Sequence, residues 1–297
     1  MLGRVLIHKL GAAGDVVRTT PLLKVLEGYE IHWLVGSKNG GLLVGLGVSV
    51  FTSVEQIPRG VLYDLVVSLE EDPKQLAALF PVISYAQIVG TYLTKSGEID
   101  YTDSAQTWFD MSLISRLGKK RADVLKLQNR RSYQSILFQM LGHEFKGEPY
   151  CCQVDVSDTR ENKILLADHV GSTWPSKRWA YFTELEATLA ERKVSVTRLP
   201  WMSNFADLAA EVARFDTVVC CDSLPMHLAL GTGVPKIVCI FTCTSPWEIF
   251  DYGRMSRVIS PRLTQDFYIQ DERFEAMSSI NVPTVMDYLE LPHRSDA

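Results

Sequence analysis

The stretch RVLIHKLGAAGDVVRTTPLLKVLEGYEIHWLVG, residues 4–36, decides how the chain folds. Two short runs rich in apolar and β-branched residues, at 4–10 and 31–36, flank the helical pattern DVVRTTPLLKVLEGY at 15–29. A strand, a helix and a second strand in this order are typical of a parallel sheet with crossover helices. The stretch therefore predicts an α/β fold.

The same rhythm occurs in two series along the chain. In the first series, DLVVSL and AQIVG continue the strands, and long helical patterns run from about Ala105 to Leu141. A polar, linker-like stretch at 145–162 precedes a second series with the strands KILLADHV, KVSVTRL, DTVVCCD and KIVCIF. We therefore expect two Rossmann-like, doubly wound domains, 1–155 and 156–297, that face a central cleft, with ligands beyond the carboxyl ends of the strands. The final helix could pack back on the first domain.

Composition narrows the partners and the compartment. A formal net charge of -5 argues against nucleic acid as a partner, because phosphate binding leaves a basic footprint on a domain. The first apolar run is too short for a signal peptide or a membrane span, so at most peripheral membrane contact is expected. The six cysteines show no metal-ligand spacing and lie mostly in apolar runs, which favours a cytoplasmic, reduced protein.

The first candidate motif is KLGAAGD at 9–15, directly after the first strand. Gly11 and Gly14 would permit a tight turn and close approach of a ligand, in front of a helix N-terminus that favours anions. The alternative is that Asp15 only caps the helix. Pro21 leaves a second choice open: the helix begins at Asp15 and is kinked, or Thr20 caps a helix whose first residue is Pro21.

The second candidate motif is GSTWPSKRW at 171–179, after the first strand of the second series. Hydroxyls, exposed backbone and Lys177 at the start of a helix are groups that can hold a diphosphate without a metal ion. A capped helix with a solvated basic turn explains the same letters.

The third candidate motif is CCDSLPMHLALG at 220–231, between two apolar strands. Asp222 or Ser223 can cap a helix that opens at Pro225, and Gly231 or Gly233 can end it. Such a helix would point its N-terminus at the cleft. His227 in its first turn could touch a ligand, although a lone histidine is more often a packing residue.

The three motifs in this order resemble the family 9 glycosyltransferases, the bacterial heptosyltransferases. The resemblance rests on KLGAAGDVVRTTPLL at 9–23, GSTWPSKRW at 171–179 and DTVVCCDSLPMHLALGTGVPKIVCIFTCTSP at 216–246. It also includes YDLVVSL at 63–69 and MSSINVPTVMDYL at 277–289. It implies a GT-B fold with an acceptor-binding first domain, a nucleotide-sugar-binding second domain and inversion at the anomeric carbon.

The resemblance also implies roles for individual residues. Asp15 matches the catalytic base, and Lys177 matches the lysine that binds phosphate. The other positions that match the donor site are Ser172, Thr173, Asp222, Ser223, Met226, His227 and Thr244. The loop on the acceptor side of the cleft would comprise Lys9, Gly11, Gly14, Arg18 and Thr19.

This sequence departs from the family pattern at three places. Leu224 stands where the family usually has glycine, and Thr242-Cys243-Thr244-Ser245-Pro246 replaces a glycine-containing loop. The stretch between Lys177 and Asp222 is shorter than usual and lacks a strand and helix that carry a ribose-contacting acid in the family.

The function that we expect is an inverting glycosyltransferase that moves a sugar, a heptose or a related one from an ADP-sugar, to an acceptor hydroxyl of a glycan, a lipid-linked glycan or another molecule. No DxD motif occurs, so neither a metal nor another cofactor is expected. A nucleotide-sugar epimerase and a catalytically silent nucleotide-binding protein are the alternatives. The basic segment Arg116 to Arg131 could dock an anionic acceptor or form a solvated helical face.

Overall fold

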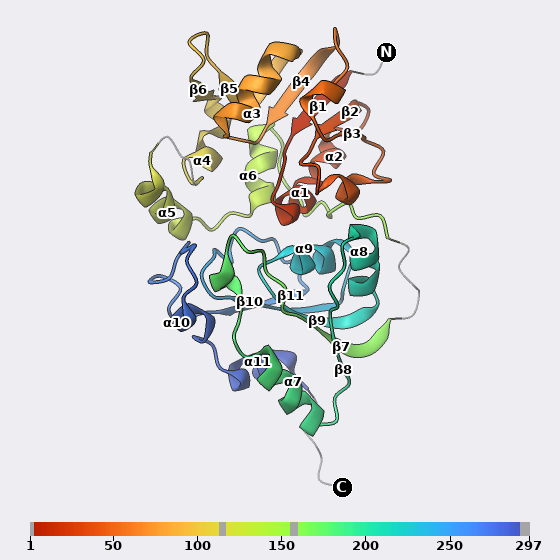
Figure 1. Cartoon of the computed structure of the whole chain (residues 1–297), viewed down its shortest axis with the longest axis vertical. Helices are drawn as coiled ribbons and strands as arrows, with labels where there is room; N and C mark the ends of the chain where they lie inside the picture. The colour runs from red at the N-terminus through yellow and green to blue at the C-terminus, as the bar shows by residue number, and fades with distance from the viewer. Residues whose placement is uncertain (1–2, 113–116, 155–159, 292–297) are drawn as a thin grey trace. The chain divides into compact units, whose positions relative to one another are not determined.

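The computed structural model describes residues 3–112, 117–154 and 160–291 of the chain. It divides into two compact units, Met1–Gln153 and Val154–Ala297, which Figure 1 colours from red to green and from green to blue. The predicted domain boundary, between residues 155 and 156, lies outside the described residues.

The first unit contains a six-stranded sheet of order β3-β2-β1-β4-β5-β6. All neighbouring strands are parallel except β5 and β6, which are antiparallel. The strands are β1 (Arg4–His8), β2 (Glu30–Leu34), β3 (Ser49–Phe51), β4 (Leu62–Ser68), β5 (Ser84–Leu93) and β6 (Ile99–Tyr101). This order is that of a doubly wound fold, in which the order of the strands reverses between β1 and β4, the switch point of the sheet.

Both faces of this sheet are covered, as the apolar runs of its central strands predict. Val5 and Ile7 of β1 join one buried cluster, whereas Leu6 between them joins a second cluster on the opposite face. This alternation follows from the two-residue repeat of a strand. The helices are α1 (Ala13–Thr19), α2 (Leu22–Val25), α3 (Pro73–Leu79), α4 (Gln106–Phe109), α5 (Lys119–Gln128) and α6 (Tyr133–Met140). Single 3₁₀ turns are η1 (Gly40–Leu43), η2 (Val54–Gln56), η3 (Phe80–Val82) and η4 (Asp103–Ala105).

The second unit contains a five-stranded parallel sheet of order β11-β10-β9-β7-β8. The strands are β7 (Glu161–Ala167), β8 (Val196–Arg198), β9 (Phe215–Cys221), β10 (Lys236–Phe241) and β11 (Met255–Ile259). The helical elements are η5 (Pro175–Lys177), α7 (Phe182–Glu191), α8 (Phe205–Ala213), α9 (Leu224–Gly231), α10 (Phe274–Met277) and α11 (Val282–Leu289). In this sheet the order of the strands reverses between β7 and β9, which is its switch point.

Helices also cover both faces of the second sheet. In Figure 1, α7 and α11 lie on one side of the sheet and α8 and α9 on the other. The apolar face of α11, with Val282, Val285 and Met286, lies in the core of this unit together with Trp179 and Leu185. The last described helix is therefore part of the core of the second unit.

The structure corrects the expected start of the first helix. Helix α1 begins at Ala13, two residues before Asp15, and ends at Thr19, while α2 begins only at Leu22. Thr20 and Pro21, which lie between the two helices, also have helical backbone angles. The alternative of a kinked helix is thus close, with its start two residues too late, and the alternative with Thr20 as the cap of a helix that begins at Pro21 is wrong. The described helices include none that is long and apolar enough to cross a membrane, and all six cysteines are free thiols.

His8, the last residue of β1, is a buried polar residue at the carboxyl edge of the first sheet. Its Nδ1 lies 3.4 Å from Ser68 Oγ, and its Nε2 has no hydrogen-bond partner among the described residues. Burial, together with the charge of Lys9, lowers the pKa of His8 to about 3. The folded protein therefore holds His8 neutral, because a buried charge without a partner is costly.

His8 should make the protein less stable in mild acid. Its pKa is lower in the folded state than in the unfolded chain, so the stabilisation is complete above about pH 6.5 and is lost as the pH falls towards 3. Between pH 7 and pH 5 the loss is about 2 kcal/mol. His8→Gln should reduce the loss in unfolding free energy by about this amount in urea titrations at both pH values. The exposed His143→Gln serves as the control and should behave like the wild type; an equal loss in the His8 variant would contradict the assignment.

Candidate functional site

A lysine and a carboxylate form a pair at the switch point of the first sheet, between β1 and β4. Lys9 follows β1 and Glu70 follows β4, and their side chains pair with Nζ 2.9 Å from Oε1. The same Glu70 oxygen accepts hydrogen bonds from the backbone N–H groups of Leu10 (2.7 Å) and Gly11 (3.5 Å). Burial lowers the pKa of Lys9, but the charges of Glu70 and Asp15 outweigh this and leave it above the usual value. Glu70 thus holds the loop that leads into α1.

Asp15 stands in the first turn of α1 with a carboxylate that is about one-third exposed, 33% of its side-chain surface. One oxygen lies 2.8 Å from the Arg18 guanidinium. The other accepts a hydrogen bond from the backbone N–H of Ala12 at 3.3 Å and lies 4.0 Å from Lys9 Nζ. Asp15 therefore helps to cap the helix from its third position, and Ala12 rather than Asp15 occupies the N-cap position. The capping role and an exposed carboxylate coexist in one residue.

Arg18 and Thr19 fasten α1 to α6. The Arg18 guanidinium lies over the Tyr133 ring at 4.0 Å. Thr19 Oγ1 donates to the backbone oxygen of Asp15 (2.6 Å) and lies 2.8 Å from Tyr133 Oη. Since Thr19 is fully buried, it supports the helix rather than offering a group to a ligand. Of these two predicted residues, only Arg18 contacts the Asp15 side chain.

The glycines act differently from the sequence interpretation. Neither Gly11 nor Gly14 has a positive φ angle, and Gly14 lies inside α1. A Cβ atom on Gly11 would lie 2.9 Å from the Asn39 amide nitrogen, so this glycine allows a close contact between loops. Gly36 makes a tighter approach, because its Cβ would lie 2.7 Å from the backbone oxygen of Leu10. The sequence reasoning did not single out Gly36.

Two further acidic residues at this edge were also missed. Glu70 and Glu71 directly follow the run VVSL at 66–69, with which β4 ends, and this position is the signal that could have found them. Glu71 is buried and accepts a hydrogen bond from Tyr101 Oη at 2.8 Å. Burial raises the pKa of Glu71 above the usual value.

The second unit has a similar lysine and carboxylate pair at the switch point of its own sheet, between β7 and β9. Lys177 follows β7 and Asp222 follows β9, with Nζ 3.0 Å from Oδ2. Thr244, after β10, donates its hydroxyl to the same oxygen at 2.7 Å. Burial raises the pKa of Asp222, but the charges of Lys177 and His227 outweigh this, and the pKa lies below the usual value. The structure thus brings four predicted residues together from three strand ends.

The loop that carries Lys177 is shaped by buried hydrogen bonds. Ser176 donates to the backbone oxygen of Asp271 (2.5 Å) and accepts from the backbone N–H of Arg273 (2.9 Å). Thr242 donates to the backbone oxygen of Ser176 at 2.6 Å. Lys177 therefore lies in the 3₁₀ turn η5, not at the start of an α-helix as expected. Ser172 and Thr173, upstream in the loop, are exposed.

Helix α9 forms where it was predicted, and the two side chains proposed from it for the donor site, Met226 and His227, are both buried. It begins at Leu224 with Ser223 as the N-cap residue and ends at Gly231. His227 is buried in the first turn beside Asp222. Met226 is fully buried, and its sulfur lies 3.2 Å from Cys239 Sγ. The Met226 side chain therefore belongs to the core in this structure and does not line an open site.

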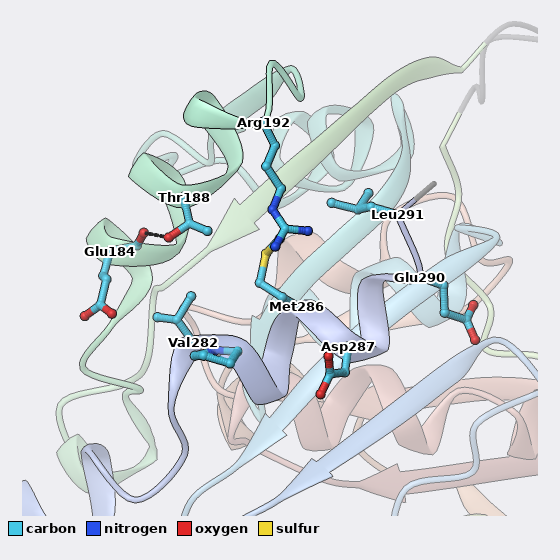
Figure 2. Close-up of a pocket in the computed structure, with 9 residues that line it drawn as sticks. Glu184, Thr188, Arg192, Val282, Met286, Asp287, Glu290 and Leu291 are labelled. Atoms are coloured by element: carbon cyan, nitrogen blue, oxygen red, sulfur yellow. Dashed lines mark hydrogen bonds between the residues drawn. The ribbon is translucent and has the colours of Figure 1, made fainter. Parts of the chain in front are cut away.

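A pocket of about 450 Å³ lies elsewhere, between α7 and α11 (Figure 2). Figure 2 shows the Arg192 side chain reaching toward Met286 across it. Its lining comprises Glu184, Thr188, Arg192, Val282, Pro283, Met286, Asp287, Glu290 and Leu291. No residue predicted for the site lines this pocket, and it lies between the helices rather than at the carboxyl edge of the strands. Within the described residues, no three His, Cys, Asp or Glu side chains are grouped so that they could hold a metal ion.

Similarity to known proteins is found among solved structures and not among sequences. No protein-family model matches the sequence, and no curated protein is detectably similar to it in sequence. Among solved structures, the E. coli heptosyltransferase WaaC with ADP is similar to this chain with a TM-score of 0.64 at 15% identity, over 97% of this chain and 99% of WaaC. WaaC with ADP-2-deoxy-2-fluoro heptose gives a TM-score of 0.60 at 14% identity over the same shares.

Two other solved structures cover almost the whole chain. The family 9 glycosyl transferase from Veillonella parvula has a TM-score of 0.60 at 14% identity, over 97% of this chain and 96% of its own. The iron-containing dodecameric glycosyltransferase TibC from enterotoxigenic E. coli has a TM-score of 0.58 at 15% identity, over 96% of this chain and 77% of its own. The resemblance found in the sequence is thus confirmed for the fold: this chain is an α/β protein with the GT-B fold of the heptosyltransferases.

Proposed function

We propose that the protein is an inverting glycosyltransferase that transfers a sugar, a heptose or a related one, from an ADP-sugar to an acceptor hydroxyl. The observation that carries the proposal is the Asp15 carboxylate, which is fixed by Arg18 and the Ala12 N–H and still one-third exposed. A carboxylate held at the carboxyl edge of a sheet, where doubly wound folds bind ligands, is suited to accept a proton from a substrate.

The proposed reaction is a single displacement. The acceptor oxygen forms a bond to the anomeric carbon while the bond from that carbon to the diphosphate oxygen breaks, and the hydroxyl proton passes to Asp15. The nucleoside diphosphate leaves with the electron pair. Arg18 pairs with the carboxylate and holds it in place, and Asp15 takes the proton late, when the hydroxyl oxygen is already bonding to carbon.

The donor site is proposed for the edge of the second sheet at Lys177. Its ammonium group and the N-terminus of α9 face the same strand ends, and both favour a negatively charged diphosphate. Ser172 and Thr173 supply exposed hydroxyls in the same loop. The WaaC structures contain ADP and an ADP-heptose analogue, which supports an ADP-sugar as the donor of this chain.

The acceptor is proposed to be a hydroxyl of a glycan, free or lipid-linked, that binds at the first unit. Of the basic segment, Arg116 lies outside the described residues, and Lys119, Lys120 and Arg121 are exposed on α5, as the alternative of a solvated helical face predicts. Lys126 is the exception, because it is buried with Nζ 5.3 Å from the Trp108 ring. Lys119 pairs with Asp123 on the surface of α5. Six free thiols support a reducing compartment such as the cytoplasm as the place of the reaction.

Asp15→Asn should lower turnover by a factor on the order of 10² to 10⁴, because it removes the proton acceptor while keeping the shape of the side chain. Donor binding should remain. The assay is release of ADP from ADP-heptose with a lipopolysaccharide core glycan as acceptor, and Asp103→Asn is the surface control. Turnover close to that of the wild type would remove Asp15 from the mechanism.

Lys177→Ala should weaken ADP binding roughly tenfold to a hundredfold, the range for a hydrogen bond to a charged group. Its melting temperature should fall as well, since Asp222 would then be buried without its cation. Calorimetry well below the melting temperature separates the two effects. Lys163→Ala, at the opposite end of β7, is the matched control. An unchanged affinity for ADP in the Lys177 variant would displace the diphosphate from this edge.

Transfer should continue in excess EDTA, because Lys177 and the N-terminus of α9 can stabilise the leaving diphosphate and the sequence has no DxD motif. A parallel reaction with added Mg²⁺ should run at a similar rate. Elemental analysis of the purified protein would detect a tightly held metal, which EDTA alone could leave in place. Strict dependence of transfer on an added divalent ion would contradict metal independence.

A further inference from the structure

Trp201 is the most exposed large apolar side chain of the described residues, with 80% of its surface accessible. It lies in the loop that follows β8, at the carboxyl edge of the second sheet. His169, in the loop after β7, lies against it with ring centroids 5.9 Å apart and ring planes at 75°. The exposed Trp201 ring, with the His169 ring in edge-to-face contact beside it, is an open aromatic surface, which we call the Trp201 platform.

The Trp201 platform is attached to the same loop as the proposed diphosphate site. The loop after β7 begins at Asp168, carries His169 and continues through Ser172 and Thr173 to Lys177. Asp168 pairs with Arg198 at the end of β8, with Oδ2 2.8 Å from Nη1. This ion pair joins the strand ends that present the two rings.

The sheet order sets the direction in which a bound nucleotide extends. Lys177 and Asp222 meet between β7 and β9, and β8 lies beyond β7, about 5 Å further along the sheet. On the other side, after β10, Thr244 and Ser245 are 2% exposed and leave no open surface. From a diphosphate at Lys177, the accessible direction is towards β8.

We propose that the Trp201 platform stacks on the nucleobase of the donor, an inference that rests on the proposed donor site at Lys177. Aromatic side chains stack on the π faces of bases, and this stacking depends little on which base is bound. The stretch between Lys177 and Asp222 is the one that is shorter than usual in the family, and β8 and α8 with the Trp201 loop between them form part of it. Base stacking by Trp201 supplies recognition within this short stretch.

The test compares a ligand that has a base with one that has none. ADP binding is measured by calorimetry, and inorganic pyrophosphate by its competition with ADP. Trp201→Ala should weaken ADP binding roughly fivefold to a hundredfold, while the inhibition constant of pyrophosphate stays the same. Trp201→Phe should restore most of the affinity. Lys177→Ala should weaken both ligands, and Tyr288→Ala, an exposed aromatic residue on α11, should weaken neither.

The outcomes separate the platform from the proposed function. Wild-type affinity of Trp201→Ala for ADP would overturn the Trp201 platform and leave the donor site at Lys177 standing. Equal weakening of ADP and pyrophosphate would also overturn it, because Trp201 would then act on the shape of the loop. A wild-type protein that binds neither ligand would overturn the proposed function together with the platform. Because Trp201 is exposed, we expect its variants to fold like the wild type, and melting temperatures check this.

Discussion

Each half of the molecule depends on one lysine paired with one carboxylate at the switch point of its sheet, where the order of the strands reverses. Lys9 and Glu70 join the ends of β1 and β4, and Lys177 and Asp222 join the ends of β7 and β9. Parallel strands place their carboxyl ends at one edge, and at the switch point the loops that follow two neighbouring strands diverge and leave a crevice between them. A buried charge needs a partner, and each pair thereby fixes the position of both loops.

The two pairs do different work because their carboxylates have different neighbours. Glu70 accepts two backbone N–H groups besides the lysine, so it shapes the chain at Leu10 and Gly11 and leaves Asp15 as the exposed acid. Asp222 accepts only side-chain donors in the contacts described here, from Lys177 and Thr244. The first pair therefore positions a loop, whereas the second positions a cation at the surface of its sheet. This difference agrees with a proton acceptor in one unit and an anion site in the other.

Strands and motifs were predictable because their signals are local. Every apolar run named in the sequence forms a strand, and Ser223 caps α9 and Gly231 ends it as predicted, although the helix begins at Leu224, one residue before Pro225. Roles that depend on a distant partner could not be predicted in this way. Thr19 becomes a buried support only because Tyr133 lies against it, and Met226 enters the core only because Cys239 of the adjacent strand faces it. Three strands were missed. β3 and β6 have three residues each, too few for a clear periodicity, and β11 (MSRVI) is interrupted by the polar pair Ser256 and Arg257.

The pairing of Lys177 also limits how a diphosphate can bind in the proposed site. Replacing Asp222 as the partner of the lysine would leave a buried carboxylate without its cation, which costs several kcal/mol. A phosphate that binds beside Asp222 and shares the lysine avoids this cost, because an ammonium group has three N–H donors. Asp222 and Thr244 then act as the support that orients Lys177, and Leu224 keeps a side chain where close backbone approach would need glycine. In this arrangement the phosphate is held by side-chain donors and by the field of α9, with less contribution from backbone N–H groups than a glycine at position 224 would allow.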